Sequence, residues 1–191
     1  MGFKSEFLFC ADQSRYMIEI ISIQLASPEE SSAVADIGRI TFYETWREVN
    51  TEEDMLLYMK ESFHEKKIKE ELFDTTNNLF LLTREGDHII GYAKMRRDRT
   101  YDEFKGTKVI EIERIYLRKE FQKKKIGKLL MDRCIELAKA EHNSWLWLAV
   151  NTENRNAIDF YTRYGFEVFG TKFFKLGNAE DQDYLMKLSL D

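Results

Sequence analysis

The stretch from Glu111 to Lys128 constrains this chain most, because it predicts a strand, a short basic loop and a helix start in direct succession. After it, apolar residues recur at three- and four-residue steps, which predicts a helix of roughly four turns from about Lys125. The loop has Glu120 as its one anion among six cations: Arg118, Lys119, Lys123, Lys124, Lys125 and Lys128. A run of cations is usually a solvated face. At a helix amino terminus, however, free N–H groups and the helix dipole also favour an anion, so we predict a pyrophosphate site.

The strand contains a break in its pattern. Apolar residues up to Ile112 alternate with glutamates, whereas Ile115 and Leu117 fall on the opposite phase. One extra residue near Glu113-Arg114 restores the alternation, as in a β-bulge, which leaves an N–H unpaired and re-aims its neighbours. A central strand buried on both faces explains the same pattern. The strand alone leaves both interpretations open.

The rest of the chain predicts strands and helices around this unit. Predicted strands cover residues 17–25, 78–84, 88–96, 144–150, 166–174 and 183–190, and predicted helices cover 27–47, 50–72 and 151–164. Ser27, Pro28 and Glu30 have the spacing of a capping box at a helix start. Gly91, inside a strand, predicts a bulge or a close approach of another chain segment. Residues 97–108 are polar and predict a loop.

Length and charge limit the kind of protein. A chain of 191 residues fits one domain, 1–191, with residues 1–16 as a loose leader. The net charge of −5 argues against nucleic-acid binding and suits a cationic substrate. Cys10 and Cys134 are too few for a disulfide framework, and the histidines lack metal-ligand spacing, so we expect no metal. No apolar run approaches the ~20 residues that span a bilayer, so we expect a soluble, cytoplasmic protein with no membrane association.

Two motifs resemble those of the GNAT N-acetyltransferase superfamily. Gln122-x-x-Lys125-x-Gly127 is similar to its Gln/Arg-x-x-Gly-x-Gly/Ala acyl-CoA motif, and residues 154–166 are similar to its Asn-x-x-Ala and Phe-Tyr-x-x-x-Gly-Phe signature. Residues 41–46, 111–116 and 176–186 look most like bacterial PaiA-type spermidine/spermine N-acetyltransferases. The resemblance covers roughly residues 17–190. It implies an α+β (mixed α/β) fold with a mixed, mostly antiparallel sheet of six or seven strands flanked by about four helices.

The resemblance also implies acetyl-CoA as cosubstrate. Lys125 stands where the superfamily often has glycine; lysine keeps the N–H donor and adds charge, so we expect binding to survive. Asn154 is expected both to cap its helix and to contact the pantetheine arm. The residues expected to bind acetyl-CoA are Ile115, Tyr116, Leu117, Gln122, Lys123, Lys124, Lys125, Ile126, Gly127, Lys128, Asn154 and Tyr161.

Acetyl transfer to an amine needs a base, because an amine of the lysine type has a pKa of about 10.4. By position, Glu113 matches the strand glutamate that takes the proton in similar polyamine acetyltransferases, directly or through water. Glu111 is the alternative base, a contact for a second ammonium, or simply a solvent-facing carboxylate, and Glu44 is a further candidate substrate contact. Tyr161 matches the tyrosine that protonates the departing sulfur. An unpaired N–H near Ile115 is expected to stabilise the thioester oxygen.

The leading interpretation is an acetyl-CoA-dependent N-acetyltransferase that acts on a primary amine, namely a polyamine such as spermidine or spermine. Direct transfer in a ternary complex is favoured, because Gly-x-Ser-x-Gly, a Walker loop and a metal-ligand cluster are absent from the sequence. One alternative acceptor is a protein amino terminus, a lysine or another small amine. Another class is a non-catalytic CoA-binding module, against which Glu113 and Tyr161 together argue. The expected partner is a small-molecule amine, and a homodimer is compatible with the resemblance.

Overall fold

The protein is described by a computed structural model, which covers residues 6–7, 21–176 and 179–191, with side chains for 21–175 and 181–191. The strands form one sheet in the order β1-β2-β3-β4-β5-β6-β8-β7. Every neighbouring pair is antiparallel except β5 and β6, which are parallel. The strands are β1 (Glu6–Phe7), β2 (Ile21–Leu25), β3 (Asn78–Glu85), β4 (His88–Arg96), β5 (Val109–Leu117), β6 (Trp145–Asn151), β7 (Glu167–Leu176) and β8 (Ala179–Ser189).

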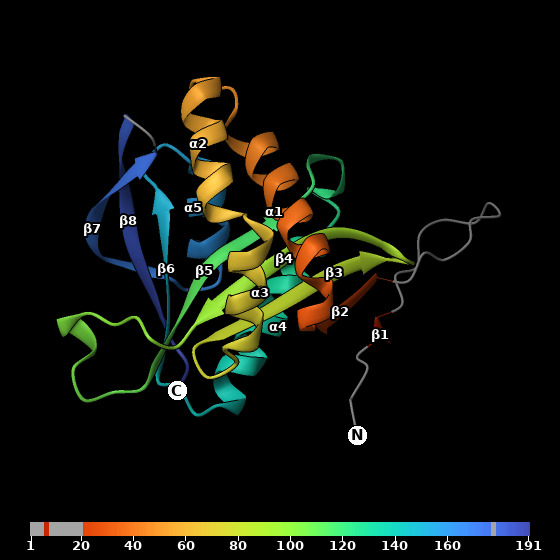
Figure 1. The fold of residues 1–191 in the computed structure, drawn as a ribbon. Helices are drawn as coiled ribbons and strands as arrows, with labels where there is room; N and C mark the ends of the chain where they lie inside the picture. The colour runs from red at the N-terminus through yellow and green to blue at the C-terminus, as the bar shows by residue number, and fades with distance from the viewer. Residues whose placement is uncertain (1–5, 8–20, 177–178) are drawn as a thin grey trace, which may run out of the picture.

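Helices cover both faces of this sheet. The helices are α1 (Ser31–Trp46), α2 (Glu52–Ser62), α3 (Glu65–Phe73), α4 (Ile126–Ala140) and α5 (Arg155–Arg163). In Figure 1, α1, α2 and α3 lie in front of the sheet and α4 lies behind it. One core cluster joins α1–α3 to β3 and β4, and a second joins α4 and α5 to the opposite face. The predicted mixed α+β fold is therefore confirmed. None of the helices in the described part of the chain is long and apolar enough to cross a membrane.

Two predicted helices differ in detail from the observed ones. The capping box at Ser27 is present, but it opens a 3-10 turn, Pro28–Glu30, and α1 follows from Ser31. The predicted helix over 50–72 is two helices with a break between them. α2 ends at Ser62, and His64 caps the start of α3, because its Nδ1 accepts a hydrogen bond from the N–H of Lys66. Helical periodicity continues through this break, so the sequence pattern conceals it.

The amino-terminal predictions fall largely outside the described residues. The predicted first strand, 17–25, corresponds to β2 from Ile21 onward, and residues 17–20 are not described. The predicted leader, 1–16, is described only at Glu6–Phe7, which pairs with Ser22 and Ile21.

The phase break in β5 is a β-bulge, the first of the two interpretations that the sequence left open. Lys94 pairs with Arg114 and Met95 pairs with Ile112, so Glu113 is the extra residue on β5. The bulge lets Ile112 and Ile115 both face the core beneath α4. It also places the polar residues of β5 on the face that α1–α3 cover, and these are Glu111, Glu113, Arg114 and Tyr116.

Gly91 lies where β4 passes close to the end of β5. A Cβ atom at this position would lie 2.4 Å from Leu117 Cδ2 and 2.5 Å from the carbonyl oxygen of Tyr116. The predicted close approach is therefore present. The carbonyl is backbone and cannot rotate away, so the space cannot be made by a side-chain movement alone.

We expect Gly91→Ala to lower the free energy of unfolding by about 1–3 kcal/mol, the usual cost of overpacking. Urea unfolding measures this directly. Gly127→Ala is the matched control, because a Cβ there would meet only Leu117 Cδ1, at 3.6 Å. Equal unfolding free energies for wild type and Gly91→Ala would show that the strands separate freely at this point.

Candidate active site

The site begins where two parallel strands stop pairing. The ladder between β5 and β6 ends at Ile112 and Leu148, yet both strands continue. Beyond this point β5 stays paired with β4, and β6 stays paired with β8. The edges of β5 and β6 that face each other are therefore without a strand partner. A ligand can take hydrogen bonds from these edges.

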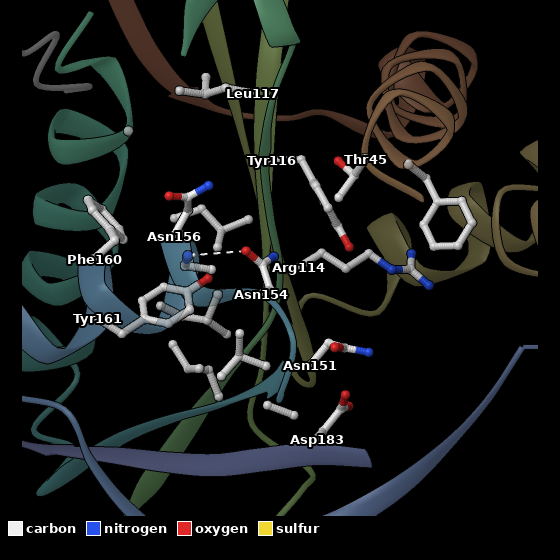
Figure 2. Close-up of a pocket in the computed structure, with 18 of the residues that line it drawn as sticks. Thr45, Arg114, Tyr116, Leu117, Asn151, Asn154, Asn156, Phe160, Tyr161 and Asp183 are labelled. Carbon is white, nitrogen blue, oxygen red and sulfur yellow. Dashed lines mark hydrogen bonds between the residues drawn. The ribbon is translucent and has the colours of Figure 1, made fainter. Parts of the chain in front are cut away.

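A cavity of about 1060 Å³ opens at this point. Its walls come from α1, α2, β5, the basic loop, the start of α4, β6, α5, β7 and β8. Figure 2 shows side chains of β5, such as Arg114 and Tyr116, on one side and Asn154, Asn156 and Tyr161 on the other. The cavity therefore connects the basic loop with the sheet face that α1 and α2 cover.

The basic loop presents its backbone to the cavity. Lys123 and Lys125 have positive φ values of 62° and 63°, and α4 begins directly after Lys125. No described residue accepts a hydrogen bond from the backbone N–H groups of residues 123–127. Five successive free donors at the positive end of a helix form a site for an anion such as a phosphate. Positive φ at Lys125 also explains why glycine would fit this position without strain.

The side chains of this loop divide into two groups. Gln122, Lys123, Lys125, Gly127 and Lys128 line the cavity, although the ammonium of Lys128 pairs with Asp132 Oδ2 at 2.6 Å. Lys124 instead lies over the ring of Phe121, with its Nζ 4.9 Å from the ring centroid, and Ile126 is buried in a small apolar cluster. Any contribution from Lys124 and Ile126 to ligand binding therefore comes from their backbone.

The start of α5 supplies the opposite wall. Asn154 caps this helix, and its Oδ1 accepts a hydrogen bond of 3.2 Å from the N–H of Ala157, drawn dashed in Figure 2. Tyr161 is buried and lines the cavity, and burial raises the pKa of its phenol well above the ordinary value. The phenol therefore stays protonated and can act as an acid. Tyr164 is fixed in packing, because its hydroxyl donates to Asp132 Oδ1 at 2.8 Å.

Glu111 is a buried carboxylate with few neighbouring groups that could stabilise its negative charge. The residue is 2% exposed, its Oε2 has no hydrogen-bond partner among the described residues, and the nearest cation, Arg99 Nη1, lies 3.7 Å away. Burial raises the pKa of Glu111 to about 7, with Arg99 opposing the shift and Glu113 adding to it. Near neutral pH this carboxylate can therefore both accept and release a proton.

Glu113 has the opposite environment. Its carboxylate lies 2.6 Å from Lys94 Nζ and 3.8 Å from both Arg96 and Arg99. Burial favours a higher pKa, but Arg114, Lys94 and Arg99 outweigh it, so the pKa of Glu113 is lowered. Both glutamates line the cavity. Glu113 is held as a permanent anion, whereas Glu111 is poised to titrate.

Glu44 connects α1 to the basic loop. Its Oε2 accepts a hydrogen bond of 2.8 Å from the backbone N–H of Lys119, and its Oε1 lies 3.6 Å from Arg118 Nε. The side chain lines the cavity, but its charge is already engaged. Glu44 therefore fixes the start of the loop, and a substrate contact by this residue remains a prediction.

Several charged residues of the cavity were not found by sequence reasoning. Arg99 comes from the polar loop after β4, while Lys172, Asp181 and Asp183 come from the hairpin of β7 and β8. They have no motif spacing relative to the glutamates of β5. Only the strand order, which places β8 beside β6, brings them to the same cavity.

Comparison with known proteins agrees with this architecture. Residues 40–166 match the model of the acetyltransferase (GNAT) family. The chain is 32% identical over 170 residues to an uncharacterised N-acetyltransferase from Lactobacillus delbrueckii subsp. lactis, which covers 89% of this chain and 98% of that protein. It is 26% identical over 158 residues to the spermidine N(1)-acetyltransferase of Thermoplasma acidophilum, covering 79% and 91% respectively.

A solved structure has the same fold. The PaiA N-acetyltransferase of Thermoplasma acidophilum, solved in complex with coenzyme A, superposes with a TM-score of 0.73 at 23% identity and covers 88% of this chain and 98% of its own. The free backbone donors before α4, the break between β5 and β6, and the family match across residues 40–166 agree with one another. The chain therefore belongs to the acetyltransferase (GNAT) family and is an N-acetyltransferase.

Proposed function

We propose that the protein transfers the acetyl group of acetyl-CoA to a primary amine of a polyamine such as spermidine, directly and within a ternary complex. The observation that carries this proposal is Glu111, a buried cavity carboxylate without a hydrogen-bond partner in the described chain and with a pKa of about 7. Such a group suits an ammonium that must lose a proton before it reacts. The spermidine-acetylating relative from Thermoplasma acidophilum supports the choice of acceptor.

The residues present fit coenzyme A. The free N–H groups of residues 123–127 can hold its pyrophosphate, and Lys123 and Lys125 add positive charge beside them. The unpaired edge of β5 after Ile112 can bind the pantetheine arm, with Asn154 on the opposite wall. When bound, acetyl-CoA supplies a thioester as the acyl donor.

Glu111 is the base in this proposal, in place of Glu113. A base must be ionised yet ready to take a proton near the working pH, and a pKa of about 7 meets both needs. Glu113 is committed to Lys94 at 2.6 Å, so protonating it would break a buried ion pair. Its role here is to hold Arg99, which lines the cavity beside Glu111, and to pair with the buried Lys94.

The proton from the ammonium passes to Glu111 as the nitrogen–carbon bond forms. The carbon–sulfur bond breaks in exchange, and Tyr161 gives its phenol proton to the sulfur, because burial keeps that phenol protonated. A backbone N–H beside the bulge, near Ile115, donates to the thioester oxygen as its negative charge grows. Exchange with solvent then returns both groups to their starting protonation states.

The loop before α4 gives a test of the cosubstrate site. We expect Gly127→Leu to weaken coenzyme A binding by about tenfold or more, because its side chain would fill the space next to the free N–H groups. Lys124→Ala should change it far less, since Lys124 does not line the cavity and contributes only a screened charge. Isothermal calorimetry with coenzyme A compares the two. If both variants lost the same coenzyme A affinity, binding would depend on side-chain charge, and the proposed backbone site would be contradicted.

Turnover with a panel of amines tests the proposed function. The protein, acetyl-CoA and each amine are mixed, and free coenzyme A is measured as thiol. The panel should contain spermidine, spermine, simple monoamines, and peptides with a free amino terminus or lysine. We expect release to be fastest with the polyamines. Release with peptides alone would replace the polyamine assignment, and no release with any amine would overturn acetyl transfer to amines.

A further inference from the structure

A second carboxylate of the cavity has no partner. Asp183 of β8 is 8% exposed, and its carboxylate makes no hydrogen bond or ion pair with any residue that the structure describes. It lines the cavity, and Figure 2 shows its carboxylate pointing from β8 toward Asn151 and the interior. Neither carboxylate oxygen is among the atoms sealed from solvent, so the group opens into the cavity, where a cationic ligand can reach it.

The neighbours of Asp183 leave it unsatisfied. Asn151 of β6 and Lys172 of β7 are its cross-strand partners. Asn151 uses its Oδ1 to accept from the N–H of Glu153 at 2.8 Å, and Lys172 makes no ion pair with Asp183. Burial raises the pKa of the Asp183 carboxyl, Lys172 lowers it and the nearby Asp181 raises it. The group is therefore a site for a cation that comes from outside the protein.

Asp183 and Glu111 lie on one face of the sheet at a distance that a chain molecule can span. Glu111 pairs with Trp147, and Asp183 pairs with Asn151, four residues further along β6. The two positions are thus roughly 13 Å apart along the sheet and two strand spacings of about 4.8 Å apart across it, with both side chains reaching inward.

The sheet surface between these two carboxylates is apolar, because Ala149 of β6 and its cross-strand partner Leu185 of β8 lie between them in register, and Ala149 lines the cavity. Phe42 and Tyr58 line the cavity from α1 and α2, and Phe174 lines it from β7. Tyr58 and Phe174 meet edge to face, with ring centroids 5.7 Å apart. An apolar surface between two anions, with aromatic rings further along the same cavity, suits a ligand whose methylene groups separate its cations.

We infer that Asp183 binds the distal ammonium of the acceptor, while the reacting amine lies at Glu111. The inference rests on the proposed function and gives its acceptor a chemical class: a chain with cations at both ends and methylenes between them. It also assigns the second ammonium to Asp183 instead of Glu44, whose carboxylate is already engaged by Lys119 and Arg118. Asp183 is a specificity residue in this scheme and takes no part in bond making.

A site with two separated anions should discriminate among acceptors by the length of the chain between their two amines. Linear diamines from diaminopropane to diaminodecane, together with spermidine and butylamine, are assayed with wild type and Asp183→Asn. For wild type we expect kcat/KM to rise with the separation of the two amines and to exceed that of butylamine. Asp183→Asn should raise KM for spermidine about tenfold or more, with kcat nearly unchanged, and remove the dependence on length. Asp87→Asn, the same charge change at the exposed turn between β3 and β4, should behave as wild type.

Binding and stability separate the outcomes. Calorimetry of spermidine binding to the coenzyme A complex should show an affinity about tenfold or more lower for Asp183→Asn than for wild type, even if no amine were turned over. That result would uphold the subsite while the proposed function failed. If Asp183→Asn turned over amines and its kcat/KM depended on diamine length as in wild type, the second cation site would be disproved while the proposed function would stand. Asp183→Asn should also melt no lower than wild type, because it removes an unpaired buried charge; a lower melting temperature would indicate a structural role instead and overturn the inference.

Discussion

Glu111→Gln is expected to lower kcat/KM for an amine acceptor by about two to four powers of ten, the usual contribution of a general base. The substitution keeps the shape of the side chain but removes the one cavity carboxylate whose pKa lies near 7. Coenzyme A affinity should stay close to that of wild type, because Glu111 is remote from the loop before α4. Steady-state kinetics with spermidine, together with calorimetry of coenzyme A, measures both quantities.

The pH dependence follows from the sign of the shift. The pKa of Glu111 is raised, so the group becomes a base only as pH rises through about 7. Wild-type kcat/KM should climb through this region, whereas the remaining activity of Glu111→Gln should climb only at higher pH, where the free amine itself loses its proton. Because the folded protein holds this proton more tightly than the unfolded chain, ionised Glu111 costs stability above pH 7. Glu111→Gln should therefore be at least as stable as wild type at pH 8.

Glu113→Gln is the matched comparison, since it makes the same chemical change two residues away. It should keep the rise of activity near pH 7 and lose stability, because it removes a partner of the buried Lys94. If Glu113→Gln lost the rise and Glu111→Gln kept it, the two roles would have to be exchanged.

The second large effect concerns Lys94→Met. Lys94 is fully buried in β4, and its Nζ lies 2.9 Å from Glu71 of α3 and 2.6 Å from Glu113. Its removal leaves two largely buried carboxylates without their shared cation, which should cost about 3–5 kcal/mol of unfolding free energy. Urea unfolding at pH 8, where both carboxylates are ionised in the unfolded chain, measures the loss.

A combined variant identifies the cause of that loss. Adding Glu71→Gln and Glu113→Gln to Lys94→Met removes the stranded charges, so we expect much of the stability to return. A loss below about 1 kcal/mol for Lys94→Met alone would mean that water already screens this group, as it does for surface ion pairs.

Features that depend on neighbouring residues could be predicted from the sequence. The bulge at Glu113 follows from a phase break within one strand, and the cap at Asn154 follows from its position before a helix. The free donors before α4 follow from a helix that starts directly after a loop, and all helices leave their first N–H groups unpaired. Each needs only the chemistry of a few consecutive residues.

Features that depend on distant segments could not be predicted. Lys94 pairs with both Glu113 and Glu71, which joins three elements, and the sequence spacing of these residues does not predict the contacts. The contrast between Glu111 and Glu113 arises from these partners, because both glutamates occupy the same strand and the same face. Asp183 reaches the cavity only because β8 inserts between β6 and β7. The base and the second cation site therefore needed the assembled sheet.

Mass spectrometry of a single reaction mixture tests direct acetyl transfer to a polyamine most directly. Protein, acetyl-CoA and spermidine are mixed in comparable amounts, quenched at short times, and the masses of both spermidine and the protein are recorded. We expect spermidine to gain one acetyl group while the protein mass stays unchanged at every time point. An acetylated protein that forms before the product and then decays would contradict direct transfer, and unmodified spermidine beside free coenzyme A would contradict the polyamine acceptor.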